Sequence, residues 1–363
     1  MSLIEKIVKP EIRNLVRIQD GFDERFNYLR LDKNERLLPF NSNLMQDFLN
    51  NLKQEDIMGY SEMGPVYLQL SGYLDVAPDQ ILIAAGGDLA IKSVYESCID
   101  RGDTIIYHAP SYAMFRIYGK MFGAKEKLFN LSMDLSHKIT DMLNLVDDET
   151  KMVVLENPNG FIGYKPELEE IEYFAAETCK RDIILLLDEA YFYVDNKRFN
   201  KQELIQKYPN MIVTQAFSKA HGLAGMRFGY LIGNSKLINY ISRVRPMHEV
   251  SSLTAKLAQW IMSNPELLEE FHRSIKDSRR FLGIELKKIG IKYMMTTANF
   301  MLLYLPNEGK TANINLKLKE KGILIRRPFD DQRLLGWSRV CIGSMDDSMR
   351  FISSLRQIIL REI

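Results

Sequence analysis

Short apolar runs alternate with longer amphipathic segments through the first two thirds of the chain, and this alternation constrains the fold more than any other feature. The runs lie at 80–85, 103–109, 151–156, 183–188, 211–217 and 228–233. Several are apolar throughout, which is typical of strands covered on both faces. The segments between them, such as 88–100 and 166–181, carry apolar residues three to four positions apart, as helices do. The pattern predicts an α/β fold with a mostly parallel sheet wrapped by helices.

A second pattern begins after Pro246. A long helical region at 254–289 comes first, and three short apolar runs and a final amphipathic helix follow it. The runs lie at 299–305, 322–326 and 338–343, and the helix lies at 345–360. A length of 363 residues is enough for about two domains. We therefore expect a smaller α+β domain after the larger α/β domain.

Charge and composition exclude several classes of partner. The chain has 48 Lys and Arg residues against 47 Asp and Glu, a net charge of +1, whereas a nucleic-acid site needs clustered positive charge. Apolar runs such as 183–187 are far shorter than the ~20 residues of a membrane helix. The amino-terminal segment MSLIEKIVKPEIRNL has no secretory signal. We predict a cytoplasmic protein that binds neither nucleic acid nor membrane.

Cysteine and histidine residues predict neither disulfides nor a metal site. Cys98, Cys179 and Cys341 are far apart and form no CxxC pair, which fits a reducing cytoplasm. The five histidines show no HExxH spacing. No GxGxxG or GxxxxGK[ST] loop is present, so ordinary dinucleotide and nucleotide triphosphate sites are disfavoured.

The segment QAFSKAHGLAGMRFGYLIG (215–233) carries the most informative set of residues. A predicted strand ends at Phe217, Ser218 and Lys219 follow it, and Arg227 precedes the next strand. The glycines among them allow a ligand to approach the backbone closely. The alternative is a surface loop whose lysine faces water, and this segment alone does not decide between the two.

A second polar group follows an apolar strand in LLLDEAYFY (185–193). Asp188 lies at the carboxyl end of that strand, and Tyr191 comes three residues later. Ligands of open α/β sheets bind outside the carboxyl ends of the strands. Asp188 is therefore a candidate functional residue, with a simple helix cap as the alternative.

Three further strand ends carry polar or aromatic residues. AAGGDLAIKS (84–93) predicts a strand, a Gly-Gly turn and a helix whose first N–H groups, at Gly87 and Asp88, attract phosphate. Tyr112 lies in APSYAMF after the next strand, and LENPNGFIGYKP (155–166) is a turn-rich stretch after another. Each signal is weak alone, but together they predict one site at one edge of the sheet.

In this order, the five strand ends resemble those of fold-type I pyridoxal-phosphate enzymes. The resemblance is to the histidinol-phosphate aminotransferase branch of the class I/II aminotransferases, and it extends from LDKNER (31–36) to SRVCIG (338–343). FSKAHGLAGMRFGY is the most specific piece, because its serine, lysine, glycines and arginine all fall in that family's register. The resemblance implies three parts: an arm with part of the small domain at 1–40, a large pyridoxal-phosphate-binding domain at 41–245 and a small carboxyl-terminal domain at 246–363.

The resemblance implies roles for four residues around the cofactor ring. Lys219 matches the lysine that bonds to the cofactor aldehyde and later moves the proton. Asp188 matches the carboxylate that pairs with the pyridine nitrogen and so makes the ring an electron sink. Tyr191 matches the donor to the cofactor's phenolic oxygen, and Tyr112 matches the aromatic residue that stacks on the ring.

The cofactor phosphate would be held by Ser218, Arg227 and the backbone N–H groups of Gly87 and Asp88. Arginine suits this role because its planar fork can engage two phosphate oxygens. GYSEMGPVYLQL resembles the segment whose tyrosine reaches the phosphate of the neighbouring subunit. This match assigns Tyr60 and implies a homodimer with shared active sites, with an ordinary half-buried tyrosine as the alternative.

Two arginines match substrate-binding residues of the branch. Arg339 matches the arginine that binds the carboxylate of the amino-acid donor, and Arg326 matches a residue linked to substrate phosphate. No role can be assigned to Arg327. For any single arginine the alternative is a surface ion pair, which contributes little energy.

The chain departs from the family pattern in two places. Where the family has an asparagine that contacts the phenolic oxygen, this chain has Gly160, so Asn159 rather than Asn157 is expected to take over that contact. The bulky Phe161 and Ile162 follow. LDKNERLLPF also differs, because Arg36 and Leu37 replace an asparagine and a proline. These changes are expected near the substrate entrance, so they bear on the substrate more than on the cofactor.

The resemblance predicts a pyridoxal-phosphate aminotransferase that moves an amino group from L-glutamate to a small ketone or aldehyde carrying phosphate. The acceptor would be imidazole acetol phosphate or a simpler keto phosphate such as dihydroxyacetone phosphate. The first alternative is a decarboxylase resembling threonine-phosphate decarboxylase. A non-enzymatic regulator is another, but it would carry an added DNA-binding segment, for which the chain has no room before the first motif, and it would not need Lys219 with Asp188. A nicotinamide dehydrogenase is the least supported, because its glycine fingerprint is missing.

Overall fold

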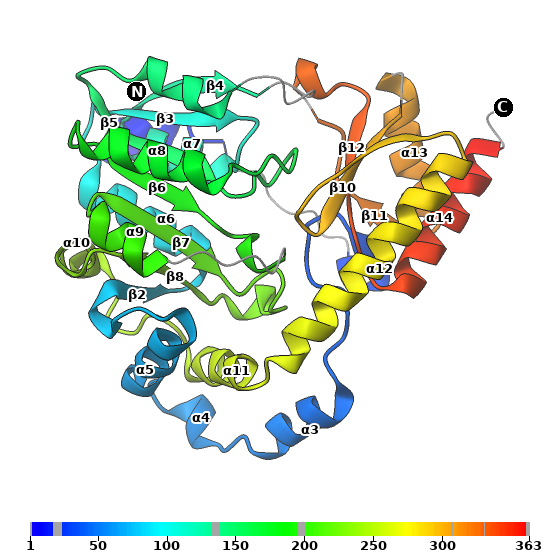
Figure 1. Cartoon of the computed structure of the whole chain (residues 1–363), viewed down its shortest axis with the longest axis horizontal. Helices are drawn as coiled ribbons and strands as arrows, with labels where there is room; N and C mark the ends of the chain where they lie inside the picture. Colours follow the sequence, from blue (N-terminus) through cyan, green and yellow to red (C-terminus); the bar gives the residue numbers. More distant parts are fainter. Residues whose placement is uncertain are drawn as a thin grey trace.

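The computed structural model describes residues 2–16, 24–131, 138–194, 201–305, 308–329 and 331–360. Its largest element is a seven-stranded sheet with the strand order β2-β8-β7-β6-β5-β3-β4 (Figure 1). The strands are β2 (Ile81–Ala84), β3 (Thr104–Ala109), β4 (Lys125–Asn130), β5 (Thr150–Glu156), β6 (Ile184–Asp188), β7 (Met211–Ala216) and β8 (Gly229–Gly233). β8 is antiparallel to both of its neighbours, and every other pairing is parallel. The predicted α/β class with a mostly parallel sheet is confirmed.

The apolar runs are continuous because both faces of the sheet are covered. Successive residues of β6 serve opposite faces, since Leu185 and Leu187 belong to one core cluster and Leu186 belongs to the other. Helices α6 (Gly86–Cys98), α7 (Ala113–Phe122) and α10 (Ser235–Ile241) cover the face of Leu186. The opposite face is covered by α5 (Met63–Leu74), α8 (Leu168–Cys179), α9 (Lys201–Lys207) and α11 (Ser252–Ser263).

The strand pattern missed β4, which lies at the edge of the sheet. Its sequence KEKLFN has no apolar run, and exposed residues recur along its length. An edge strand needs only one paired side and tolerates charged residues, which also discourage edge-to-edge aggregation. The short strands β1 (Leu29–Leu31) and β9 (Lys292–Met295) were missed as well.

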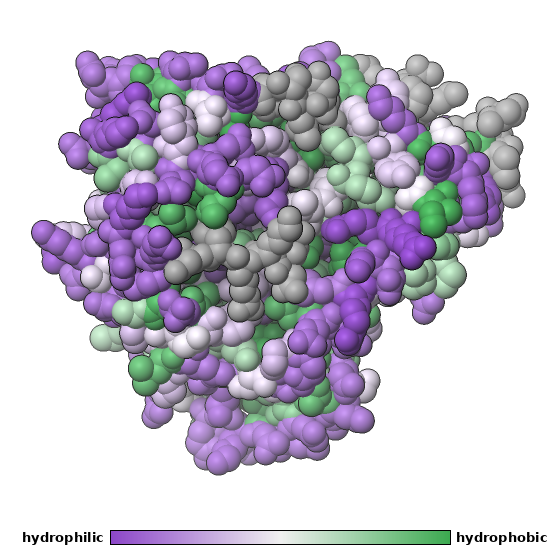
Figure 2. Space-filling view, in the orientation of Figure 1, coloured by the Kyte–Doolittle hydropathy of each residue, from purple (hydrophilic) through white to green (hydrophobic). Residues whose placement is uncertain are grey.

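A second unit lies beside the sheet in Figure 1. β9, β10 (Phe300–Tyr304) and β12 (Trp337–Cys341) form an antiparallel sheet in the order β12-β10-β9, whereas β11 (Ile323–Ile325) pairs in parallel with β1. The helices of this unit are α12 (Glu266–Lys288), α13 (Glu308–Glu320) and α14 (Met345–Leu360). Hydrophilic residues cover the outer side of α12 (Figure 2). The three predicted strands and the final helix are present.

The predicted long helix at 254–289 is two helices, α11 and α12, with Asn264 and Pro265 between them. α11 contributes to the core cluster of the large sheet, whereas most of α12 packs in the second cluster. The division of the chain at residue 246 stays a prediction, and this packing favours a boundary near the start of α12.

The remaining helices are short and precede the large sheet. They are α1 (Leu3–Ile7), α2 (Pro10–Arg13), α3 (Ser42–Asn50) and α4 (Glu55–Met58). Among the described residues, no helix is both long enough and apolar enough to cross a membrane.

Candidate active site

The predicted residues after β2, β3, β5, β6 and β7 gather at the carboxyl edge of the large sheet. In Figure 1 this edge faces the second unit. A half-buried guanidinium crosses from that unit, because Arg339 on β12 donates from Nη1 to the carbonyl of Gly160 at 2.5 Å and from Nη2 to the carbonyl of Asp32 at 3.3 Å. Three distant parts of the chain therefore meet at one place.

Lys219 lies in the connection between β7 and β8 and is half-buried. A tight turn follows it, in which the N–H of Gly222 donates to the carbonyl of Lys219 at 3.1 Å. The Lys219 amine donates to the carbonyl of Lys33 at 3.1 Å and lies 5.2 Å from the centre of the Tyr191 ring. The lysine is thus oriented toward the other predicted residues.

Asp188 ends β6 and is 7% exposed. The N–H of Ala190 donates to its Oδ1 at 3.0 Å, and it forms no ion pair with any described residue. Burial raises the pKa of the Asp188 carboxyl to about 7, against the opposing effects of the Ala190 N–H and the Lys219 charge. No α-helix starts at Asp188, since a turn and the 3₁₀ helix Phe192–Val194 follow it. The helix-cap alternative therefore fails.

The next residue, Glu189, is a buried carboxylate that, unlike Asp188, has an ion-pair partner within the protein. It lies 3.3 Å from the Lys201 amine and accepts hydrogen bonds from Asn157 at 3.0 Å and from Gln215 at 2.6 Å. Glu189 is therefore compensated by the protein, whereas Asp188 beside it has no cationic ion-pair partner among the described residues.

Tyr191 lies between the two units. Its hydroxyl accepts a hydrogen bond from Nδ2 of Asn34 at 2.9 Å, and its ring packs edge-on against Phe300 with 5.8 Å between centroids. A side chain at Gly160 would place its Cβ 3.0 Å from the Tyr191 ring. The bulk of a larger residue at 160 would thus meet the tyrosine.

The structure brings Asp88, Tyr112 and Arg227 together at the amino end of α6. The Tyr112 hydroxyl donates to Oδ1 of Asp88 at 2.5 Å, and Nη2 of Arg227 donates to Oδ2 at 3.2 Å. Burial raises the pKa of Tyr112, so its phenol keeps its proton. A Cβ at Gly86, where φ is +83°, would lie 2.5 Å from the Arg227 guanidinium. The positive φ favours glycine here, and any side chain at 86 would displace the guanidinium.

Two kinds of donor at this place are not engaged within the protein. The N-cap residue of α6, Ala85, offers no side-chain acceptor to the first N–H groups of the helix. The hydroxyl of Ser218 makes no hydrogen bond to any residue in the described ranges. A helix amino end with a nearby arginine and a hydroxyl is the chemistry of an anion site.

Asn159 has a structural task. Its Nδ2 donates to the carbonyl of Pro110 at 2.8 Å and to the carboxylate of Glu156, and its Oδ1 accepts from the N–H groups of Phe161 at 2.9 Å and Ile162 at 2.8 Å. These bonds occupy both protons of the amide and both lone pairs of the oxygen. The prediction that Asn159 contacts a cofactor has no support in this geometry. Oδ1 of the buried Asn157 has no partner among the described residues.

Arg339 and Arg326 both lie beside the ring of Phe161. Their guanidinium carbons are 5.6 Å and 5.0 Å from its centre, and Arg326 also lies 4.6 Å from the centre of the Phe329 ring. Burial lowers the pKa of Arg339, and its Nε has no partner among the described residues. Arg339 bonds only to carbonyls and forms no ion pair with a described carboxylate. A half-buried cation without a carboxylate partner favours a bound anion.

Two exposed residues and one buried residue complete the set that the sequence singled out. Tyr60 is 81% exposed and stacks on His248 with 4.0 Å between ring centroids, outside the site of its own chain. Arg327 is exposed. Arg36, expected near the substrate entrance, is buried and donates to the carbonyls of Ala220 and Leu267, each at 3.0 Å.

The sequence placed the changes at Arg36 and Leu37 near the substrate entrance but did not single out the three residues before Glu35 as part of the site. Asp32, Lys33 and Asn34 contact Arg339, Lys219 and Tyr191, although 157 to 307 positions separate the partners in each pair. It also missed Glu156, whose carboxylate accepts from the Tyr112 N–H at 3.2 Å. Only the position of Glu156 at the end of a strand could have indicated it.

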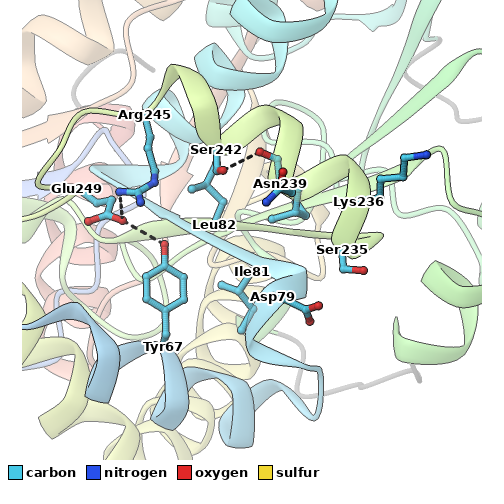
Figure 3. Close-up of a pocket in the computed structure, with 11 residues that line it drawn as sticks. Tyr67, Asp79, Ile81, Leu82, Ser235, Lys236, Asn239, Ser242, Arg245 and Glu249 are labelled. Atoms are coloured by element: carbon cyan, nitrogen blue, oxygen red, sulfur yellow. Dashed lines mark hydrogen bonds and ion pairs between the residues drawn. The ribbon is translucent and has the colours of Figure 1, made fainter.

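A groove of about 430 Å³ lies at the outer edge of the large sheet, beside β2 and α10 (Figure 3). Glu249 in this groove accepts from Arg245 at 2.8 Å and from the Tyr67 hydroxyl at 3.3 Å. None of the predicted site residues lines it. Within the described ranges, no group of three or more His, Cys, Asp or Glu residues is placed to hold a metal ion.

Comparison with known proteins confirms the resemblance to the class I/II aminotransferases. The family model "Aminotransferase class I and II" matches residues 57–355. The chain is 29% identical over 361 residues to histidinol-phosphate aminotransferase of Caldanaerobacter subterraneus subsp. tengcongensis, covering 98% of this chain and 100% of that protein. The structure of histidinol-phosphate aminotransferase from Sinorhizobium meliloti in complex with pyridoxal-5'-phosphate has a TM-score of 0.87 at 21% identity and 98% coverage of both chains. L-threonine-O-3-phosphate decarboxylase from Porphyromonas gingivalis has a TM-score of 0.76 at 19% identity, covering 92% of this chain and 99% of that chain.

Proposed function

The chain belongs to the aminotransferase class I and II family, and on that premise we propose that it uses pyridoxal phosphate to move an amino group from L-glutamate to a small phosphorylated ketone or aldehyde. Imidazole acetol phosphate is the leading acceptor, because the full-length relatives at 27–29% identity are histidinol-phosphate aminotransferases. A simpler keto phosphate such as dihydroxyacetone phosphate is the second choice.

The residues present fit pyridoxal phosphate in charge and position. The uncapped start of α6, Ser218 and Arg227 would hold the phosphate. Asp188 is a buried carboxyl without an ion pair, as a partner of a protonated pyridine nitrogen should be. Lys219 would join the cofactor covalently, and Tyr191 would donate to its phenolic oxygen. When bound, the cofactor supplies the electron sink that stabilises a substrate carbanion.

The observation that carries the substrate assignment is the pair of guanidinium groups beside Phe161. Arg339 is half-buried and has no carboxylate partner among the described residues, so it fits the carboxylate of an amino-acid donor. Arg326 lies next to the same ring and fits a phosphate on the acceptor. Two anion-binding groups in one site favour substrates that carry a carboxylate or a phosphate at matching positions.

Lys219 holds the catalytic amine in this proposal. When it is not bonded to the cofactor, the amine would be free to take the proton from the substrate carbon and to hold it at Nζ. The Lys33 carbonyl, at 3.1 Å, limits the directions in which this amine can point. Arg339 orients the donor by its carboxylate, which sets the bond that is to be broken near the lysine.

We extend the proposal to a homodimer in which Tyr60 reaches the phosphate in the partner subunit. Tyr60 is 81% exposed and stacks on His248. The apolar side chains of Ile57 and Met58, which precede Tyr60 in the sequence, and of Met247, which precedes His248, are 77–85% exposed. Exposed apolar clusters of this kind mark interaction surfaces. The cytoplasmic location also stays a prediction, in keeping with the three free cysteines.

The test is the visible absorption spectrum of the purified protein with pyridoxal phosphate, before and after addition of L-glutamate. We expect a yellow band that bleaches with glutamate and returns when a keto phosphate is added. Comparing imidazole acetol phosphate with dihydroxyacetone phosphate then selects the acceptor. If the band does not respond to glutamate and the protein releases carbon dioxide from a phosphorylated amino acid, the decarboxylase is established instead. Absence of any band would refute the cofactor assignment.

A further inference from the structure

Residues 32–36 cross the proposed active site although they precede the matched family region, which starts at residue 57. The carbonyl of Asp32 accepts from Arg339, and the carbonyl of Lys33 accepts from the Lys219 amine. The side chain of Asn34 bonds to Tyr191, and that of Arg36 bonds to the carbonyl of Ala220. The segment thus contacts the key residues of both units, and the side chain of Asn34 bonds directly to one of the proposed catalytic side chains.

Asn34 is held firmly in this place. Its side chain is fully buried, with an exposed fraction of 0%. Its backbone is left-handed, with φ of +55°, a conformation that asparagine tolerates better than most residues. Its carbonyl accepts from Nδ2 of the buried Asn299 at 3.0 Å. The Asn34 amide therefore has little freedom to move away from the Tyr191 hydroxyl, 2.9 Å distant.

The direction of this hydrogen bond has a chemical consequence. A tyrosine hydroxyl carries one proton and two lone pairs. Nδ2 of Asn34 can only donate, so it occupies a lone pair of the Tyr191 oxygen and leaves the hydroxyl proton for another acceptor. A hydroxyl that already accepts one hydrogen bond is also a better donor, because chained hydrogen bonds polarise one another.

We propose that Asn34 is a positioning residue that directs the Tyr191 proton to the phenolic oxygen of the cofactor. This inference rests on the proposed function, since it requires that oxygen beside Tyr191. Asn34 fixes where the hydroxyl lies and which way its proton points, while Tyr191 makes the contact. The unpartnered Oδ1 of Asn34 is consistent with an amide whose orientation is set by its nitrogen.

Two substitutions test the hydrogen bond between residues 34 and 191: one removes it, and the other reverses its direction. Asn34→Gly removes the amide and relieves the left-handed backbone. Asn34→Asp keeps the shape, but a carboxylate only accepts, so it draws the Tyr191 proton to itself. We expect conversion of the bound cofactor by glutamate to slow about fivefold in Asn34→Gly, the value of one hydrogen bond, and more in Asn34→Asp.

The pH at which the visible band of the bound cofactor changes should move upward in both variants. A donated hydrogen bond favours the anionic phenolic oxygen, and its loss lets the cofactor hold its proton to higher pH. In a Tyr191→Phe background, neither change at Asn34 should alter the rate or the pH midpoint further. Asn43→Asp and Asn43→Gly, on the exposed start of α3, serve as matched controls.

Additive effects of the Asn34 and Tyr191 changes, with the band present, would overturn this inference and leave the proposed function intact. An unshifted pH midpoint in Asn34→Asp would do the same. If the wild-type protein forms no band at all, both are overturned. Urea unfolding of the cofactor-free single and double variants separates a folding defect from a local effect. We expect the free energies of unfolding to show coupling between residues 34 and 191 as well. Absence of this coupling would show that the two side chains do not bond in solution.

Discussion

The two halves of the proposed site are built in different ways. The cofactor half, with Asp88, Tyr112, Asp188 and Arg227, sits on the strand ends of one sheet, and three of these side chains bond to one another. The substrate half is assembled around Phe161 from segments that lie far apart in the chain. The sheet supplies the first half by its own topology, whereas the second half exists only when the two units pack together.

This difference also appears in how charge is compensated. In the cofactor half, Arg227 already has a carboxylate partner in Asp88 at 3.2 Å. In the substrate half, Arg339 bonds to backbone carbonyls alone among the described residues. The arginine of the first half is therefore already paired without ligand, whereas the arginine of the second half has no carboxylate partner among the described residues and is placed to bind an anion. Substitutions should thus affect the two halves in separable ways.

The largest expected effect tests the cofactor half. Lys219→Ala should lower the rate of amino transfer by at least about 10³-fold, because it removes both the covalent link and the group that moves the proton. The yellow band should also shift, since the cofactor can no longer bond to this side chain. Lys236→Ala, an exposed lysine of the outer groove, is the control. Equal rates for Lys219→Ala and wild type would refute the catalytic assignment.

The second prediction concerns Asp188 in the cofactor-free protein. Its carboxyl has a pKa of about 7 in the folded state against an ordinary value of 3.8. The folded state therefore holds this proton more tightly than the unfolded chain, and the free energy of unfolding should fall as the pH rises from about 4 to 7. At about 1.4 kcal/mol per pKa unit, this fall in the free energy of unfolding is on the order of 4 kcal/mol at most. Asp188→Asn should abolish it, because the amide does not titrate.

Urea unfolding at pH 4.5 and pH 8 measures this difference, with the exposed Asp79→Asn as the control. Asp188→Asn should flatten the dependence, and Asp79→Asn should leave it as in wild type. Identical pH dependences for Asp188→Asn and wild type would mean that the buried carboxyl is compensated by a group that the apo site already holds. The charge of Asp188 in the cofactor half would then already be compensated without the cofactor.

The fold was largely predictable because burial on both faces leaves a continuous apolar run in the sequence. β2, β3, β5, β6, β7 and β8 all follow from such runs. β4 could not be found in this way, since an edge strand faces solvent and carries lysine and glutamate. The break between α11 and α12 was missed because apolar spacing continues across Asn264 and Pro265.

The site was predictable only where sequence position fixes spatial position. Asp188 and Tyr112 could be placed together because parallel strands end at the same edge of a sheet. Asn34 could not be placed, because its contact with Tyr191 depends on how the two units pack across 157 intervening positions. The Asn159 contact stays a prediction: a motif suggested it, but the local turn already uses both lone pairs of the Asn159 amide oxygen.

The third prediction tests the substrate half. Arg339→Lys keeps a positive charge but loses the planar fork that matches a carboxylate. We expect the KM for glutamate to rise about 100-fold, the value of one or two charge-assisted hydrogen bonds. The absorption band of the bound cofactor before glutamate is added should remain unchanged, because Arg339 belongs to the other half. A loss of cofactor affinity equal to the loss of glutamate affinity would show that the two halves are not separable.

The smallest effect divides the substrate half itself. Phe161 contacts both arginines, but Arg339 also bonds to the carbonyls of Gly160 and Asp32 and lies 5.4 Å from the centre of the Phe300 ring. Arg326 depends more on Phe161, at 5.0 Å, and on Phe329. Phe161→Leu should therefore raise the KM for the keto phosphate about fivefold, the value of a cation–π contact near 1 kcal/mol, and change the KM for glutamate less than twofold. Steady-state kinetics with each substrate varied in turn measures both values. An equal rise in both would mean that Phe161 shapes the site as a whole instead of supporting Arg326.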